Sequence, residues 1–279
     1  MQVVSNLPEL RQARARLSGP VGLVPTMGYL HVGHLSLVRA ARTDCASTVV
    51  SIFVNPTQFG PSEDLAAYPR DLSRDLALLD QEGADLVWTP DPDGMYPPGY
   101  QTWVSVDHLT ARLEGQMRPG HFRGVTTLVT KLFSAVQPDR AYFGQKDAQQ
   151  ALVIRRMVSD LNFPLEVVIL PIFREPDGLA MSSRNAYLNP AERQAATVLK
   201  RSLDAAQAVF SAGERDAPRL CQVVTEVVRA EPLAALQYVS CADAETLEEL
   251  QGLVTDRALL SMAAFVGKTR LIDNLILEG

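Results

Sequence analysis

The sequence predicts an α/β fold, with a Rossmann-like open parallel sheet followed by a second, smaller α+β domain. Short runs of β-branched and apolar residues, such as Val21–Pro25 and Thr48–Val54, alternate with segments of helical periodicity. This alternation is typical of βαβ units, whose strands run parallel. The chain has 279 residues, of which 47% are hydrophobic, so it is long enough and apolar enough to bury a sizeable core.

The expected elements divide the chain near residue 172 into an open α/β domain, residues 1–172, and a smaller C-terminal α+β domain, residues 173–279. In the first domain we expect strands at 21–25, 48–54, 85–88, 140–143 and 165–170, helices at about 33–42, 70–82, 123–136 and 146–159, and a Pro/Gly-rich loop at 89–101. In the second we expect helices at about 190–211 and 216–230 and strands at 235–241, 257–266 and 269–277.

Composition points to a cytoplasmic protein that binds neither nucleic acid nor membrane. The net charge is −6, and no block of Lys and Arg suggests a nucleic-acid track. No apolar run approaches the length of a membrane span, and the first residues lack the pattern of a signal peptide. Cys45, Cys221 and Cys241 are odd in number and widely spaced, which favours neither a disulfide framework nor a zinc site.

The segment His31-Val-Gly-His34 predicts an ATP site that helps to transfer the α-phosphate. It follows a strand and opens a helix, where free N–H groups and a partial positive charge favour phosphate. Histidines three residues apart lie on roughly one helix face, and both can donate to a phosphoryl oxygen. The simpler interpretation is a pair of histidines at a helix cap. The Pro-Thr-Met-Gly before the segment and the Leu-Ser-Leu-Val after it favour the phosphate site.

Two further short segments carry groups that suit phosphate. In Gly144-Gln-Lys-Asp147, Lys146 can neutralise phosphate charge and Asp147 can accept from ribose hydroxyls, although for this segment alone an Asp N-cap beside a solvated Lys is the better interpretation. In Met181-Ser-Ser-Arg184, two hydroxyls and a guanidinium make an anion clamp, whereas the simpler interpretation is a polar turn.

Three neutral amides, Asn55, Gln58 and Gln150, suit a hydroxylated substrate because an amide both donates and accepts without adding charge. Without that context, Asn55 is a turn residue and Gln150 an exposed helix residue.

Charged residues elsewhere suggest further contacts. Arg118, in a basic segment before a helix, suits a carboxylate or pyrophosphate, or else lies in a solvated loop. Asp71 and Asp75 lie four residues apart on an expected helix and can face a magnesium ion, although the pattern alone favours a solvated helix face.

Five segments in this order resemble the pantothenate synthetase (pantoate–β-alanine ligase) family, within the His-Xaa-Gly-His nucleotidylyltransferase superfamily. The segments are Pro25–His34, Phe53–Gly60, Arg118–Val125, Phe143–Gln150 and Asp177–Asn185. The resemblance implies an ATP-dependent ligase that condenses pantoate with β-alanine through a pantoyl adenylate and releases AMP and pyrophosphate. It also implies a Mg²⁺ requirement, a homodimer, and a lid function for the smaller C-terminal domain, residues 173–279.

The same resemblance assigns roles to individual residues. It makes His34 the proton donor, with His31, Lys146 and Arg184 as further catalytic groups, and gives pantoate contacts to Gln58 and Gln150. Asp75 matches a magnesium contact of the family. The implied ATP contacts are Met27, Gly28, Tyr29, Leu30, His31, Val32, Gly33, His34, Gly144, Gln145, Lys146, Asp147, Phe173, Met181, Ser182, Ser183 and Arg184.

The chain departs from the family pattern at two positions. Phe173 stands where a smaller β-branched residue is expected, which tightens the adenine pocket unless only backbone contacts matter there. Gln145 replaces a common Glu and removes one negative charge near the phosphates.

Three rival functions make different predictions. A nucleotidylyltransferase of the same fold would release pyrophosphate without forming an amide, but its phosphorylated acceptor would need more cationic residues than the Gln58 and Gln150 pair offers. A non-enzymatic ATP-binding regulator would bind ATP without turnover. An aminoacyl-tRNA synthetase relative is disfavoured by the acidic balance and by the lack of an anticodon-sized extension.

Overall fold

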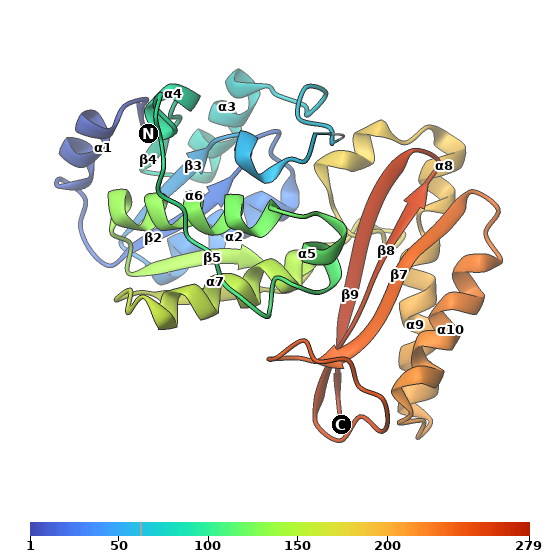
Figure 1. Ribbon diagram of the computed structural model, residues 1–279. Helices are drawn as coiled ribbons and strands as arrows, with labels where there is room; N and C mark the ends of the chain where they lie inside the picture. Colours follow the sequence, from blue (N-terminus) through green and yellow to red (C-terminus); the bar gives the residue numbers. More distant parts are fainter. Residues whose placement is uncertain (62) are drawn as a thin grey trace. The chain divides into compact units, whose positions relative to one another are not determined.

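A six-stranded parallel sheet and a three-stranded antiparallel sheet organise the protein, a computed structural model that describes residues 1–61 and 63–279 (Figure 1). The chain divides into two compact units. The first comprises residues 1–145 and 149–171, and the second comprises residues 146–148 and 172–279.

The first unit is a doubly wound α/β layer structure. Its strands are β1 (Gln2–Val4), β2 (Val21–Thr26), β3 (Ser47–Ile52), β4 (Leu86–Trp88), β5 (Arg140–Gly144) and β6 (Glu166–Leu170). Its helices are α1 (Leu7–Arg14), α2 (Val32–Asp44), α3 (Leu72–Glu82), α4 (Pro92–Met95), α5 (Leu113–Met117), α6 (His121–Val136) and α7 (Ala148–Asp160), with short 3-10 helices η1 (Pro56–Gln58) and η2 (Gln145–Asp147).

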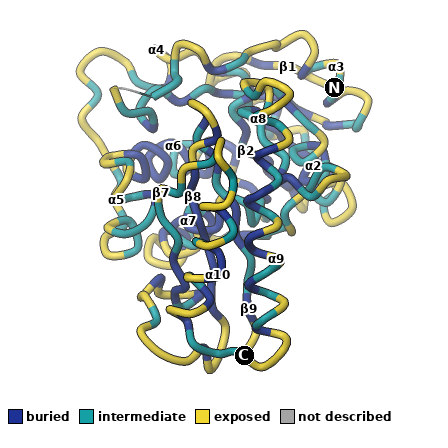
Figure 2. The backbone as a smooth tube through the Cα atoms, turned by 90° about the vertical axis from the view of Figure 1, so that its right-hand side faces the viewer, coloured by how far each residue is buried: buried dark blue, intermediate teal, exposed yellow. Residues whose placement is uncertain are grey.

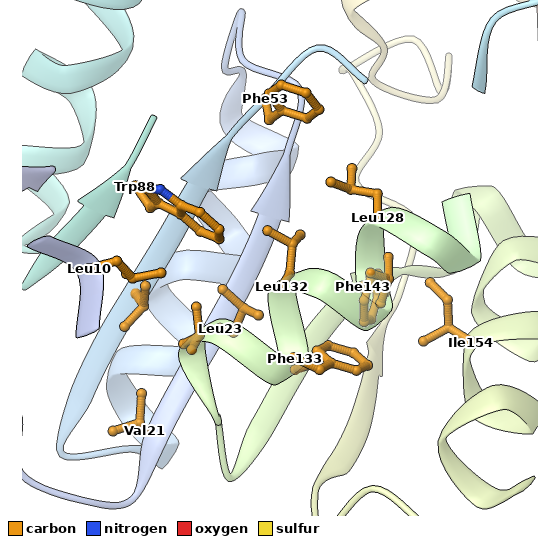
Figure 3. Packing of buried hydrophobic residues seen from close by; sticks show 14 of the residues in the cluster. Leu10, Val21, Leu23, Phe53, Trp88, Leu128, Leu132, Phe133, Phe143 and Ile154 are labelled. Atoms are coloured by element: carbon orange, nitrogen blue, oxygen red, sulfur yellow. The ribbon is translucent and has the colours of Figure 1, made fainter. Parts of the chain in front are cut away.

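Alternation along the strands gives the sheet two buried faces. Leu23 faces the core that α1, α6 and α7 cover, whereas its neighbour Val24 faces the core of α2 and α3. Figure 3 shows the first of these cores, where Leu132 and Phe133 of α6 pack among strand residues that include Leu23. Because both faces are covered, the strands are apolar nearly throughout.

The strand order β1-β4-β3-β2-β5-β6 reverses direction between β2 and β5. These two strands are parallel neighbours, with Gly22 opposite Arg140 and Leu23 opposite Ala141. The loops that leave their carboxyl ends therefore start at the topological switch point, where open α/β sheets bind ligands. Both loops carry motifs that we singled out in the sequence, His31–His34 after β2 and Gly144–Asp147 after β5.

The second unit packs helices on one antiparallel sheet. Its elements are η3 (Ser183–Tyr187), α8 (Pro190–Ala195), α9 (Val198–Ser211), α10 (Ala217–Arg229), β7 (Ala234–Asp243), β8 (Arg257–Val266) and β9 (Thr269–Glu278). The central strand β8 is buried almost throughout, and α9 alternates buried and exposed stretches as an amphipathic helix does (Figure 2). Leu199, Leu203 and Phe210 of α9 belong to the core of this unit.

The structure confirms the expected fold class but departs from the expected elements in several places, including α4 within the expected loop at 89–101 and the unexpected α5. The strand β1 is only three residues long, too short for an alternating pattern to show. The helix α1 is short, and its N-cap Asn6 accepts a hydrogen bond from the Glu9 amide. The helix expected at 190–211 is interrupted between α8 and α9, and the one expected at 146–159 begins as η2.

The expected division placed residues 146–148 in the first domain, whereas in the structure they group with the second unit. No helix in the described part of the chain is long and apolar enough to cross a membrane.

Truncating Leu132, which is 1% exposed in the main core, is expected to lower the free energy of unfolding substantially. Leu132→Ala leaves a cavity, so we expect a loss of about 2–5 kcal/mol in urea unfolding. Leu161→Ala is the matched control, because Leu161 is 50% exposed, and it should change stability by less than about 0.5 kcal/mol. Equal losses in the two variants would contradict the packing described.

Candidate active site

The loop between β2 and α2 has an unusual backbone that a buried carboxylate stabilises. Gly28 and Tyr29 both adopt positive φ, 80° and 49°. The side chain of Asp75, from α3, lies beneath them and is 1% exposed. Its Oδ2 accepts a hydrogen bond from the Tyr29 amide and its Oδ1 one from the Leu30 amide, both at 2.7 Å.

This arrangement changes what the loop and Asp75 can bind. Successive backbone N–H groups in such a conformation form a nest for an anion, and here the anion is the Asp75 carboxylate. Tyr29 and Leu30, which the family resemblance places among the ATP contacts, direct their amides to Asp75. Burial raises the pKa of Asp75, and the two amide hydrogen bonds partly oppose that rise.

The two histidines lie together at the start of α2. His31 is the N-cap residue, and the rings of His31 and His34 stack with their centroids 3.9 Å apart. The Nδ1 atom of His34 accepts from the His31 amide at 3.3 Å. A neutral His34 ring therefore carries its proton on Nε2, where it is a donor. This tautomer fits the predicted role of a proton donor to phosphate.

The loop after β3 meets the loop after β2 through Gln58. Gln58 Nε2 lies 3.2 Å from the Met27 sulfur, so two motifs that are 31 residues apart come into contact. Asn55 is fully buried, and its Nδ2 donates to Gln58 Oε1 and to the Gly124 carbonyl, both at 3.1 Å. The Cβ of any larger residue at position 124 would lie 2.4 Å from the Thr57 carbonyl oxygen, so only glycine lets α6 approach this loop.

Arg118 lies in the polar network behind Gln58. Its guanidinium makes a bidentate ion pair with Glu63, at 2.7 and 2.8 Å. Its Nη1 lies 3.2 Å from His121 Nε2, and its Nη2 donates weakly to the Gln58 carbonyl at 3.5 Å. Burial favours the neutral Glu63, but the hydrogen bond and charge of Arg118 outweigh it and lower the Glu63 pKa. A substrate that contacts Arg118, as we expected, would therefore bind a guanidinium that is already paired with Glu63.

His121 is a buried member of this network that sequence reasoning missed. Its Nδ1 lies 2.8 Å from the Gln58 carbonyl and donates to it, because that oxygen can only accept. Burial and the neighbouring Arg118 lower the pKa of His121 to about 4. A neutral histidine at this position fits the Arg118 guanidinium, which donates to its Nε2. The segment Arg118–Val125 was singled out for its basic residues, but the sequence did not indicate that the His121 ring faces the interior.

The helix α7 carries two adjacent glutamines with different surroundings. Gln149, which the sequence did not single out, is buried and accepts from the Glu114 amide at 2.9 Å. Its Nε2 donates to the Leu109 and Arg112 carbonyls at 2.7 and 2.8 Å. Gln150, the predicted pantoate contact, is half-buried one residue further along. Adjacent residues on a helix are about 100° apart, so the two side chains face different surroundings.

The second unit brings Phe173 and Met181 together in a small hairpin. The Met181 amide donates to the Phe173 carbonyl at 2.9 Å, and Arg174 pairs with Ala180 between them. Arg174 fixes the hairpin through a bidentate ion pair with the buried Asp273 of β9, at 2.7 and 2.9 Å. The Phe173 side chain is exposed, whereas the Phe173 backbone takes part in the hairpin pairing. This arrangement fits the expectation that position 173 contacts adenine through backbone atoms.

The hydroxyl loop that follows is also held by hydrogen bonds. Ser182 caps η3 by accepting from the Arg184 amide at 3.3 Å, and Ser183 is buried. Asn185 donates to Glu175 at 2.8 Å and to the Ala180 carbonyl at 3.2 Å, which ties this loop to the hairpin.

Lys146 lies in η2 between Gly144 and Asp147, and its carbonyl accepts from Asn274 of β9 at 3.0 Å. Among the described residues, no group of three or more His, Cys, Asp or Glu side chains gathers to hold a metal ion.

Comparisons with known proteins agree along the whole chain. A family model described as pantoate-beta-alanine ligase matches residues 2–276. The chain is 62% identical over 278 residues to the pantothenate synthetase of Roseiflexus sp. strain RS-1, covering 100% of both chains. It is similar to a crystal structure of pantothenate synthetase from Thermus thermophilus, with a TM-score of 0.94, 50% identity and 99% coverage of both chains.

A third match concerns a complex. The crystal structure of pantoate-beta-alanine ligase from Francisella tularensis, complexed with beta-gamma ATP and beta-alanine, has a TM-score of 0.80 and 32% identity. The match covers 99% of this chain and 97% of that chain.

Replacing Asp75 by Asn is expected to loosen the loop after β2. One of the two amides of Tyr29 and Leu30 then faces an NH₂ group, so we expect a loss of about 1–3 kcal/mol and faster exchange of both amide hydrogens. Asp71→Asn is the control, since it removes the same charge from the exposed N-cap of α3 and Asn caps as well as Asp. Unchanged exchange in Asp75→Asn would show that the carboxylate does not hold the loop.

The low pKa of His121 predicts a specific pH dependence. The unfolded chain takes up a proton below about pH 6.5, whereas the folded protein does so only near pH 4, so acid destabilises the fold across that window. Between about pH 7.5 and pH 5 this term is worth about 2 kcal/mol. His121→Asn should therefore lose about that much less stability than the unmodified chain over the same range in urea unfolding. An identical pH dependence would refute the buried neutral imidazole.

Proposed function

The chain belongs to the pantoate–β-alanine ligase family and is a ligase, and from that premise we propose that it condenses pantoate with β-alanine by way of a pantoyl adenylate. The observation that carries this proposal is the pair of stacked histidines at the switch point, with His34 Nε2 as a donor, on the loop whose Met27 sulfur contacts the neutral Gln58 amide. ATP as the co-substrate is supported by the Francisella tularensis ligase, which was solved with beta-gamma ATP and beta-alanine.

The chemistry explains why ATP is needed. A carboxylate does not acylate an amine, because the leaving group would be oxide. In the first step a pantoate carboxylate oxygen attacks the α-phosphorus, the bond from that phosphorus to the bridging oxygen breaks, and pyrophosphate leaves. In the second step the β-alanine nitrogen attacks the acyl carbon and loses a proton, the C–O bond to the phosphate breaks, and AMP leaves.

Protein groups act mainly by position and charge, since phosphoryl transfer demands little covalent help. We propose that His34 donates from Nε2 to an α-phosphoryl oxygen, with His31 supporting it in the stacked pair. The Lys146 ammonium neutralises phosphate charge at the carboxyl end of β5. Ser182, Ser183 and Arg184, in the hydroxyl loop of the second unit, are proposed as further phosphate contacts.

The proposed magnesium ion is held mainly by the phosphates of ATP. Mg²⁺ commonly binds through one or two carboxylates together with substrate phosphates, where it neutralises their charge. Asp75 is our predicted magnesium contact, and both of its carboxylate oxygens accept backbone hydrogen bonds. Asp75 can therefore bind the ion only through a remaining oxygen lone pair. We further propose that Gln58 and Gln150 bind pantoate, and that the protein is a cytoplasmic homodimer.

The reaction is tested by its products. Purified protein with ATP, Mg²⁺, pantoate and β-alanine should form pantothenate, AMP and pyrophosphate in equal amounts, measured by mass spectrometry. ADP and phosphate in place of AMP would contradict activation at the α-phosphorus. Pyrophosphate release with no β-alanine-dependent amide would favour the nucleotidylyltransferase alternative.

Removing one donor from the phosphate site is expected to slow turnover. His34→Ala and Lys146→Ala should each reduce kcat about 100- to 1000-fold, because each removes a preorganised group that stabilises developing charge. His108→Asn and Lys268→Ala are the controls, since both residues are exposed and lie outside the motifs, and their kcat should stay within about twofold. Near-normal turnover in a folded His34→Ala or Lys146→Ala variant would contradict the assigned roles.

A further inference from the structure

The Asn55 side chain is enclosed by hydrogen-bond partners on every side. Its Oδ1 faces the Thr57 amide at 3.4 Å, the Thr57 hydroxyl at 2.9 Å and the Tyr96 hydroxyl at 2.9 Å. Its Nδ2 faces the Gly124 carbonyl and Gln58 Oε1. With the side chain 0% exposed and its polar atoms all engaged, Asn55 has little left to offer a substrate.

The hydrogen-bond partners of Asn55 determine the positions of its amide oxygen and amide nitrogen. A backbone N–H can only donate and a backbone carbonyl can only accept, so the oxygen must face Thr57 and the nitrogen must face Gly124. The Asn55 nitrogen then also faces Gln58, so the Gln58 atom that it meets must be the oxygen. Gln58 is thereby oriented with its NH₂ group on the far side, toward Met27.

This orientation makes Gln58, the predicted substrate contact, a hydrogen-bond donor. Gln58 is 8% exposed, and its Nε2 carries two hydrogens, of which the Met27 sulfur is a weak acceptor for one. A substrate at Gln58 therefore meets a donor, and an oxygen of a hydroxyl or carboxylate group is the partner that fits.

The Tyr96 hydroxyl is well placed to maintain this orientation. Tyr96 lies in the Pro/Gly-rich segment after β4, just past α4, and its ring stacks with Trp103 and meets Tyr100 edge-on. The Lys131 ammonium of α6 lies 5.7 Å from the centre of the Tyr96 ring. Burial raises the pKa of Tyr96 above its ordinary value near 10, so the hydroxyl stays protonated at neutral pH. Its single proton is directed to Asn55 Oδ1, and the Tyr96 oxygen also lies 3.2 Å from the Thr57 hydroxyl oxygen.

We propose that Tyr96 is a positioning residue which, through Asn55, orients Gln58 to donate to an oxygen of the acid substrate. The proposal rests on the proposed function, which makes pantoate the substrate bound at Gln58. Reversing the Gln58 amide would require Asn55 to reverse as well, against the Thr57 amide and the Gly124 carbonyl. Loss of the Tyr96 proton lowers the cost of that joint reversal by one hydrogen bond.

The test is Tyr96→Phe, which removes one oxygen and keeps the stacked ring. We expect the KM for pantoate to rise about three- to tenfold, which corresponds to about one hydrogen bond, while kcat and the KM for ATP stay within about twofold. Tyr100→Phe is the matched control, because Tyr100 belongs to the same aromatic cluster and its ring centroid lies 5.1 Å from that of Tyr96, yet Asn55 accepts from Tyr96. Its KM for pantoate should not change.

A second measurement separates positioning from general destabilisation. In a Gln58→Ala background, Tyr96→Phe should change the KM for pantoate by less than about twofold, because there is no amide left to orient. An unchanged KM in Tyr96→Phe alone, or the same rise in both backgrounds, overturns the proposal. If the unmodified chain makes no pantothenate from pantoate, the proposed function itself fails, and this role fails with it.

Discussion

The hydrogen bonds from the Tyr29 and Leu30 amides to the buried Asp75 carboxylate are the constraint on which the site depends. A positive φ is readily adopted by Gly28 but is costly for Tyr29, and such a backbone persists only where its surroundings compensate. Asp75 compensates by filling the anion nest that the loop creates. The chain can then turn from β2 into α2 over a short loop, which places His31 at the helix start and His34 one turn later.

Because the Asp75 carboxylate occupies the nest, the Tyr29 and Leu30 amides are not the groups that bind a ligand phosphate. In many phosphate loops the nest itself holds the phosphate, whereas here its amides are already satisfied. The proposed function therefore assigns the ligand charge to side chains, and His34 in the stacked pair carries its proton on Nε2 when neutral. Neutral amides in the neighbouring loop complete the surroundings, and their orientation is set by a buried network that reaches Gly124 and His121.

The sequence predicted the fold class because apolar strands and amphipathic helices leave periodic patterns that do not depend on tertiary contacts. It also located the loops after β2, β3 and β5, since motifs at strand ends meet at one edge of a parallel sheet. The roles of particular side chains were harder to predict. Asp75 was expected to contact magnesium, and nothing in the sequence indicated that it also binds two backbone amides, because its direction depends on how α3 packs beneath the loop.

Residues whose function depends on distant partners could not be predicted at all. Tyr96 lies in a segment without periodicity, and only the fold brings its hydroxyl to Asn55, which is 41 residues away in the chain. Gln149 and Gln150 are indistinguishable by residue type, and only the helix phase decides which one is buried. The resemblance to a ligase family supplied the substrates, which no residue pattern in this chain could have specified.

The central claim is that the loop held by Asp75 activates the acid at the α-phosphorus before the amine takes part. The most direct measurement is the exchange of labelled pyrophosphate into ATP, with Mg²⁺ and pantoate present and β-alanine left out. The account predicts exchange that requires pantoate, because adenylate formation is reversible and independent of the amine. Exchange that appears only when β-alanine is added, or that proceeds without pantoate, would contradict it.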